Sequence, residues 1–218
     1  NNTSASGAAY IFDITNGTGE MKPIARLRAS DAEASDQFGV SVGIDGSYAI
    51  VGVYAEDGPS NSATDSGAAY IFDITNASGD MKPIARLRPS DAEGGDLFGF
   101  SVAISGTNAI VGATGEDGPS NSIDRAGAAY IFDITNVSGE MKPIARLRAS
   151  DREENDRFGY SVAISGNSAI VGAHLYDEEP EYDSEITAPT DMTSYRNSQY
   201  YDNVYKMSIT GASSGSIW

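Results

Sequence analysis

One serine of the chain lies in a pattern that could serve nucleophilic catalysis. Ser41 is the centre of Gly39-Val40-Ser41-Val42-Gly43, which matches the G-x-S-x-G turn that presents a serine between a strand and a helix. No helical pattern follows it, and Ala103 and Ala163 replace the final glycine 60 and 120 residues later. The only histidine, His174, has no counterpart at the same spacing. The pattern therefore favours close packing of small residues, and we expect no catalytic residues and no enzyme.

Acidic side chains form two kinds of cluster that recur every 60 residues, one before a Phe-Gly pair and one in a later loop. Their members are Asp31, Glu33, Asp36, Asp91, Glu93, Asp96, Asp151, Glu153, Glu154 and Asp156 in the first kind, and Glu56, Asp57, Asp65, Glu116, Asp117 and Asp124 in the second. Loops of Asp, Asn, Ser and Gly supply oxygen ligands that suit calcium, although the spacing differs from an EF-hand loop. The candidate calcium ligands are Asp57, Asp65, Asp117 and Asp124. The alternative is that these carboxylates cap turns and pair with Arg26, Arg28 and their copies.

Three N-x-[ST] sequons also recur at this spacing, with their asparagines at Asn16, Asn76 and Asn136. Each lies between two strand-like runs, where a glycan would be exposed in a secreted protein. The alternative is that asparagine and glycine simply form a good turn there.

Residues 174–203 form the one segment that departs from the repeating pattern. It is acidic and rich in tyrosine, and exposed tyrosines favour recognition surfaces. The candidate contact residues are Tyr182, Tyr195, Tyr200 and Tyr201. We expect a contact with a subunit or partner here, and the alternative is a long loop.

Composition excludes several classes of protein. The formal net charge of −17 repels polyphosphate, so we expect no nucleic-acid partner. The absence of cysteine excludes disulfides and thiolate zinc sites, and no residue pattern suggests an organic cofactor. No stretch approaches the ~18 apolar residues of a membrane-spanning helix.

The elements that must position these residues are repeats of 60 residues. The sequence GAAYIFDIT starts at Gly7, Gly67 and Gly127, and MKPIARLR, Phe-Gly and AIVG recur with the same spacing. Each unit predicts four strands, which in one copy are 98–105, 108–114, 127–135 and 142–150. In the first, bulky residues alternate with a small face of Gly99, Ser101 and Ala103. The third is apolar on both faces and is expected to be covered on both sides, and the fourth is expected to be a solvent-facing outer strand.

Four short antiparallel strands per unit are typical of a propeller blade. The succession Asp-x-Phe-Gly-x-Ser-Val-x-Ile, Ala-Ile-Val-Gly-Ala and Gly-Ala-Ala-Tyr-Ile-Phe resembles the FG-GAP repeat of integrin-α-like β-propellers over about residues 7–173. The resemblance implies an all-β fold, an extracellular or cell-surface location, and adhesion or scaffolding. The calcium loop that such repeats often carry between strands one and two is here only a tight turn such as Ser105-Gly106-Thr107, so that cage is not carried over.

We divide the chain into residues 1–37 (second half of a blade), 38–97 and 98–157 (two full blades), and 158–218 (a divergent final blade with the insertion 174–203). Within the last, residues 204–210 align with the third strand. About three and a half blades expose sheet edges and apolar faces. Either the chain is a fragment, or copies or neighbouring repeat subunits complete one another in a ring or filament. We expect a structural or adhesive repeat protein; the alternative is an integrin-like head in which calcium-supported loops bind an extracellular protein or glycan.

Overall fold

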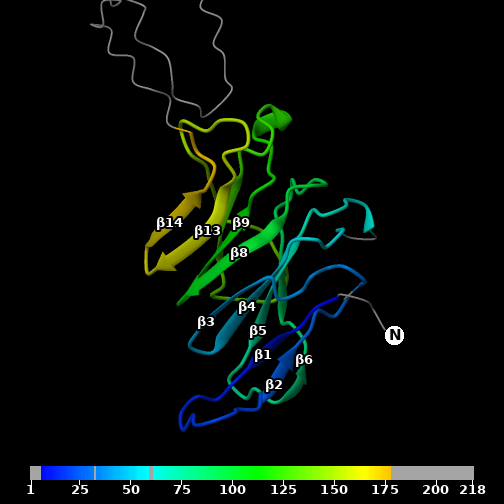
Figure 1. The fold of residues 1–218 in the computed structure, drawn as a ribbon, viewed down its shortest axis with the longest axis vertical. Helices are drawn as coiled ribbons and strands as arrows, with labels where there is room; N and C mark the ends of the chain where they lie inside the picture. The colour runs from blue at the N-terminus through cyan, green and yellow to red at the C-terminus, as the bar shows by residue number, and fades with distance from the viewer. Residues whose placement is uncertain (1–5, 32, 59–60, 178–218) are drawn as a thin grey trace, which may run out of the picture. The chain divides into compact units, whose positions relative to one another are not determined.

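The computed structural model describes residues 6–31, 33–58 and 61–177, which form strands and one short 3-10 helix, η2 (Pro119–Asn121) (Figure 1). The strands are β1 (Ala9–Ile11), β2 (Ala25–Leu27), β3 (Ser41–Asp45), β4 (Tyr48–Val53), β5 (Ala68–Asp73), β6 (Gly79–Met81), β7 (Ala85–Leu87), β8 (Phe98–Ser105), β9 (Asn108–Ala113), β10 (Ala128–Asp133), β11 (Gly139–Met141), β12 (Ala145–Leu147), β13 (Phe158–Ser165) and β14 (Ser168–Ala173). No helix of these residues is long and apolar enough to span a membrane.

The strands form blades of the predicted kind. One sheet has the order β12-β10-β9-β8, with all neighbours antiparallel, and β7-β5-β4-β3 repeats it. Two residues link β8 to β9, where Gly106 has a φ of 56°. This tight hairpin turn fits the prediction that the link is too short to enclose a cation. The fold is all-β with a 60-residue repeat, and the sheets of the described residues do not close into a ring.

Two strands were not predicted. β6 pairs in parallel with β2, and β11 pairs in parallel with β7, so each unit adds a short strand to the outer edge of the preceding blade. The outer edges of β2 and β7 are thus covered, whereas β12, which lies within the predicted strand 142–150, is the edge of its sheet among the described residues and is largely exposed, as expected. Arg148, which follows β12, is nevertheless only 13% exposed and pairs with Glu116.

The third strand β5 is buried on both faces, as predicted, whereas Tyr10 of the equivalent strand β1 is 51% exposed. Every residue from Ala68 to Phe72 is at most 1% exposed. Tyr70 and Phe72 pack in one cluster with Phe38 and Val51, and Ala69 and Ile71 face a second cluster shared with the next blade. Neighbouring blades thus share their cores. Burial of this apolar surface, which contributes ~25 cal/mol per Å², is the main source of stability.

A bulge changes the first strand from the predicted strict alternation. The register of β8 against β9 shifts between Phe98 and Ser101, and Gly99 has a φ of 93°. Phe98 consequently packs inside the blade against Tyr130, with ring centroids 5.6 Å apart. Half-buried Phe100 instead lies beside Tyr160, with centroids 5.0 Å apart. The bulge at the Phe-Gly pair therefore directs the side chains of Phe98 and Phe100 into different environments.

Candidate functional site

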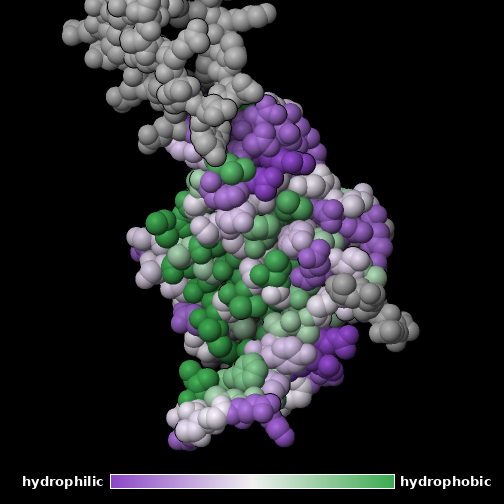
Figure 2. Space-filling view, viewed as in Figure 1, coloured by the Kyte–Doolittle hydropathy of each residue, from purple (hydrophilic) through white to green (hydrophobic). Residues whose placement is uncertain are grey.

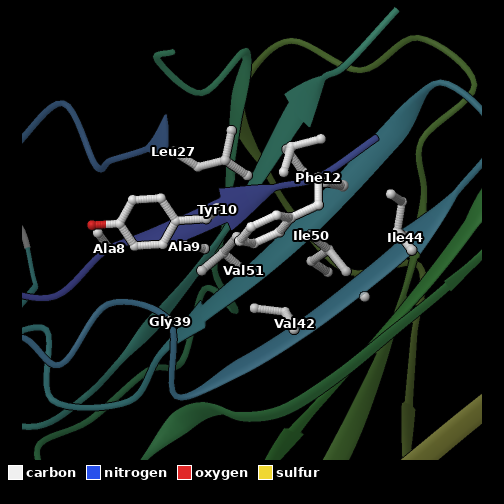
Figure 3. A pocket seen from close by; sticks show the side chains of 13 residues that line it. Ala8, Ala9, Tyr10, Phe12, Leu27, Gly39, Val42, Ile44, Ile50 and Val51 are labelled. Carbon is white, nitrogen blue, oxygen red and sulfur yellow. The ribbon is translucent and has the colours of Figure 1, made fainter. Parts of the chain in front are cut away.

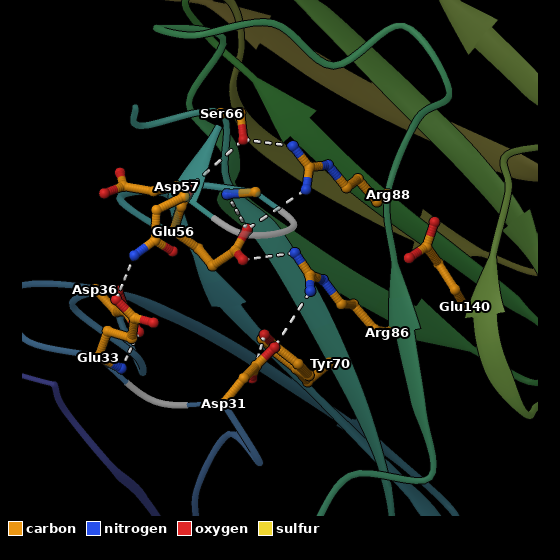
Figure 4. Close-up of polar contacts among 12 residues, drawn as sticks. Asp31, Glu33, Asp36, Glu56, Asp57, Ser66, Tyr70, Arg86, Arg88 and Glu140 are labelled. Carbon is orange, nitrogen blue, oxygen red and sulfur yellow. Dashed lines mark hydrogen bonds and ion pairs between the residues drawn. The ribbon is translucent and has the colours of Figure 1, made fainter. Parts of the chain in front are cut away.

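An acidic pocket lies at the end of two of the described blades, where three elements meet. In the first copy, the loop before β3 contributes Asp31, Glu33 and Asp36, the loop after β4 contributes Glu56 and Asp57, and β7 contributes Arg86 (Figure 4). The second copy is built from the residues 60 positions later. The two pockets have volumes of about 240 and 310 Å³. The repeat thus brings both predicted acidic clusters together in one place.

A buried glutamate organises each pocket. Glu56 is 8% exposed, and its Oε1 accepts a hydrogen bond from Arg86 Nη2 at 2.5 Å. Its Oε2 lies 3.9 Å from Arg88 Nη1 and accepts the N–H of Gly58. Glu116 repeats the arrangement with Arg146 and Arg148. This carboxylate therefore joins the loop after strand two to the fourth strand through charge-assisted hydrogen bonds.

Other carboxylates of the pocket hold turns. Asp36 Oδ2 accepts the N–H of Glu33 at 2.6 Å, and Asp57 Oδ1 accepts the N–H of Asp65 at 3.0 Å. Asp117 Oδ1 likewise accepts the N–H of Arg125. These contacts support the alternative of turn capping for the oxygens involved.

The four candidate calcium ligands do not share one position of the unit. Asp57 and Asp117 are equivalent, but the residue 60 positions after Asp65 is Arg125, and Asp124 corresponds to Thr64. Within the described ranges, no three histidine, aspartate or glutamate side chains lie in an arrangement that holds a metal ion. Calcium binding stays a prediction.

Burial in the second pocket, together with the nearby carboxylate of Glu116, raises the pKa of Asp96 to about 7. The hydrogen bond that Asp96 Oδ2 accepts from the N–H of Glu93 opposes this effect. Because the pKa in the folded state lies above the unfolded value of about 3.9, the folded chain binds this proton more tightly. The contribution of Asp96 to stability is thus full below about pH 4 and is lost as the pH rises to about 7.

Asp96→Asn is expected to remove this pH dependence, because asparagine keeps an oxygen acceptor for Glu93 and never ionises. The variant should be more stable than the parent at pH 8, on the order of 1–3 kcal/mol, and the difference should shrink as the pH falls to 4.5. Urea unfolding of both proteins at pH 8, 6 and 4.5 measures it. A constant difference between the two proteins across this range contradicts the assignment.

An apolar groove of about 410 Å³ lies between β1 and the strand pair β3–β4. Tyr10 and Phe12 from the β1 segment and Val42 and Ile44 from β3 line it (Figure 3). These side chains are 51%, 46%, 61% and 64% exposed. Figure 2 shows hydrophobic residues gathering over this part of the surface. Apolar patches of this kind mark interaction sites in soluble proteins.

The groove lies where the first blade has no first and second strands among the described residues. Val102 and Ile104, the equivalents of Val42 and Ile44 in the next blade, are each 8% exposed because a preceding blade covers them. At the other end, Ile170 of β14 is 73% exposed, whereas its equivalent Ile110 is fully buried. Sequence analysis predicted uncovered faces but not these residues; comparing equivalent positions of the repeats could have identified them.

The residues considered for catalysis have structural contacts. Ser41 lies at the start of β3, and its Oγ donates a hydrogen bond at 2.9 Å to the carbonyl oxygen of Gly99 in the next blade. Ser101 makes the same contact with Gly159. The His174 ring stacks on Tyr160 at 3.9 Å. The structure therefore places Ser41 between blades and does not bring His174 to it.

The sequon asparagines Asn16, Asn76 and Asn136 are exposed in the turn after strand three. The aspartate before each turn stabilises it in all three copies, where Oδ1 of Asp13, Asp73 and Asp133 accepts the N–H of the threonine two positions later. Glycan occupancy stays a prediction. The tyrosine candidates Tyr182, Tyr195, Tyr200 and Tyr201 lie outside the described residues, as does the predicted strand 204–210.

Comparison with known proteins adds one match. The family model described as FG-GAP repeat matches residues 22–72, 82–132 and 142–185, together about two thirds of the chain. No curated protein matches the chain significantly. The three matches follow one another at the 60-residue spacing of the blades.

Proposed function

Because the chain belongs to the FG-GAP repeat family, we propose that it is a non-enzymatic structural or adhesive building block of an extracellular or cell-surface assembly. FG-GAP repeats are found in integrin-like adhesive proteins and are typical of extracellular and surface proteins. The family is generally non-enzymatic. The proposed partners are copies of the chain or neighbouring repeat subunits.

The observation that carries this proposal is that neighbouring blades bury apolar faces against each other, while two such faces at opposite ends of the described blades are uncovered among the described residues. One contains Val42 and Ile44, and the other contains Ile170, each more than 60% exposed. Inside the stack the equivalent residues are buried by the neighbouring blade. Covering such surfaces releases the same hydrophobic free energy that joins the chain's own blades.

Light scattering and negative-stain imaging across a concentration series test the proposal. We expect the mass to rise with concentration, as particles of two or more copies, closed rings or filaments form. Single copies at every concentration contradict it. High salt should not dissolve the particles, because apolar contacts are not screened.

The acidic pockets favour a second candidate, an integrin-like head whose calcium-supported loops bind an extracellular protein or glycan. Asp31, Glu33 and Asp57 place carboxylates around one concave site, and the next blade repeats the site. This function requires that calcium raise the melting temperature and a chelator reverse the rise. A melting temperature that neither reagent changes favours assembly by stacking.

A further inference from the structure

We propose that Asn16, Asn76 and Asn136 are acceptors of N-linked glycans, carried on the turn that follows the third strand of each unit. This inference rests on the extracellular location in the proposed function and adds a covalent modification to it. Each asparagine begins an N-x-[ST] sequon, which marks this modification in a secreted protein. The alternative remains that asparagine is there to form the turn, and the contacts of the turn decide between the two.

The sequon turns and the acidic pockets lie at opposite ends of the third strand. The loop that contributes Glu56 and Asp57 to the first pocket precedes β5, and β5 leads away from it to the turn around Asn76. At that turn the N–H of Ile74 donates a hydrogen bond of 2.8 Å to the carbonyl oxygen of Ser47, in the short link between β3 and β4. A glycan on this turn therefore leaves the pocket free.

The acceptor residues are exposed even where neighbouring units are present. Asn76 and Ser78 belong to the middle copy of the turn, which has one unit before it and one after it, and both residues are exposed. Asn136 and Ser138 are exposed in the same way. Exposure at these positions is thus a property of the repeat and not of the ends of the chain.

The fold does not use the asparagine side chain. The N–H of Ala77 donates to the carbonyl oxygen of Ile74 at 3.2 Å. Asp73 Oδ1 accepts the N–H of Thr75 at 2.9 Å, which stabilises the start of the same turn. No described residue forms a hydrogen bond with the side-chain amide of Asn76.

The backbone does not require asparagine either. Turns often select asparagine because it tolerates a positive φ better than most residues. None of Asn16, Asn76 and Asn136 has a positive φ. The alternative of a turn-forming asparagine therefore lacks both a hydrogen bond and a backbone conformation to explain it.

The differences among the three copies follow the requirements of the sequon. The segments 7–20, 67–80 and 127–140 keep the asparagine and vary the residue after it, which is never proline. The third sequon position alternates between the two hydroxyl residues that a sequon accepts, although no described residue hydrogen-bonds to that hydroxyl. The varying sequon residues are Gly17, Ala77 and Val137 at the second position, and Thr18, Ser78 and Ser138 at the third.

The modification is a group transfer from a lipid pyrophosphate that carries an oligosaccharide. The anomeric carbon of the first sugar forms a bond with the asparagine Nδ2, while its bond to the pyrophosphate oxygen breaks. The lipid pyrophosphate leaves with that electron pair, and the amide nitrogen gives up one proton. The secretory pathway supplies the donor and the transferase, so the chain provides only the acceptor.

The intact mass of the chain from its natural source, in separate cellular and extracellular fractions, tests the proposal before and after treatment with peptide N-glycosidase. We expect glycan masses that this enzyme removes, with conversion of Asn16, Asn76 and Asn136 to aspartate. A mass equal to that of the bare sequence overturns the proposal. An extracellular chain of bare mass leaves the proposed function standing, whereas a bare chain found only inside cells rejects both.

Ser78→Ala and Ser78→Thr form a matched pair for secretion from cultured cells that attach N-linked glycans. Ser78→Ala removes the acceptor hydroxyl but keeps Asn76, whereas Ser78→Thr introduces the residue that the first copy has at Thr18. Neither change removes a described hydrogen bond, so circular dichroism should be unchanged. We expect S78T to carry as many glycans as the parent chain and S78A to carry one fewer. Equal glycan numbers in S78A and the parent, or a loss in S78T as well, overturn the assignment.

Discussion

Gly52→Ala is expected to lower the free energy of unfolding by about 3 kcal/mol or more, because the added methyl group has no room between blades. A Cβ at this position of β4 would overlap the carbonyl oxygen of Gly99 in the next blade, as well as the Oγ of Ser41. A hydroxyl group can rotate away, but a backbone carbonyl moves only if the whole sheet moves. The prediction is measured by urea unfolding at a protein concentration at which the parent chain does not associate.

The matched control is Gly172→Ala, which changes the same position of the last described blade. Its contacts come from Ser161 alone, so its loss of stability should be much smaller. Equal losses at Gly52 and Gly172 would mean that the cost arises inside the blade, and would contradict the close approach of neighbouring sheets.

Glu56→Gln is also expected to lower the free energy of unfolding strongly, by about 3 kcal/mol, because it leaves a buried charge without its ion-pair partner. The Glu56 and Arg88 side chains are 10% and 6% exposed. Without the carboxylate, the Arg88 guanidinium keeps a hydrogen bond to Ser66 Oγ and the weaker attraction of Glu140, but it has no ion-pair partner among the described residues. Arg86 keeps Asp31, which limits the loss.

Asp80→Asn provides the comparison, because Asp80 accepts two hydrogen bonds from Arg26 in a pair that is exposed on both sides. Solvent screens such pairs, so the change in stability should be far smaller. Thermal unfolding of both variants measures the difference. Similar melting temperatures for the two would show that the buried pocket contributes no more than a surface ion pair.

The blades could be predicted from sequence because their strands carry their own pattern. Period-two alternation and a third strand that is apolar on both faces require cover on both sides, and Tyr70 and Ile71 are buried accordingly. The bulge between Phe98 and Ser101 was missed because Gly99, whose φ of 93° allows it, was interpreted only as part of the small face of a regular strand. The short strands at 79–81 and 139–141 were missed because their pairing partners lie in another blade.

The pockets were predicted only in part. Aspartate and glutamate spacing identified the acidic clusters, and pairing with arginine was one of two alternatives. The burial of Glu56 and its contact with Arg88 depend on how two loops and an outer strand pack together. No local sequence pattern encodes this packing. Equivalence between repeats was the unused signal, since Glu116 and Arg148 reproduce the contact 60 residues later.

The parallel strands β6 and β11 also affect the order in which the blades can fold during synthesis. The outer edge of one blade stays open until the ribosome has released the next unit, because that unit supplies the closing strand. At ~5–20 residues per second, a nascent blade therefore waits several seconds for completion. Each newly made unit covers the outer strand edge of the preceding blade, which couples the folding of adjacent units. It also prevents that edge from pairing with strands of other molecules.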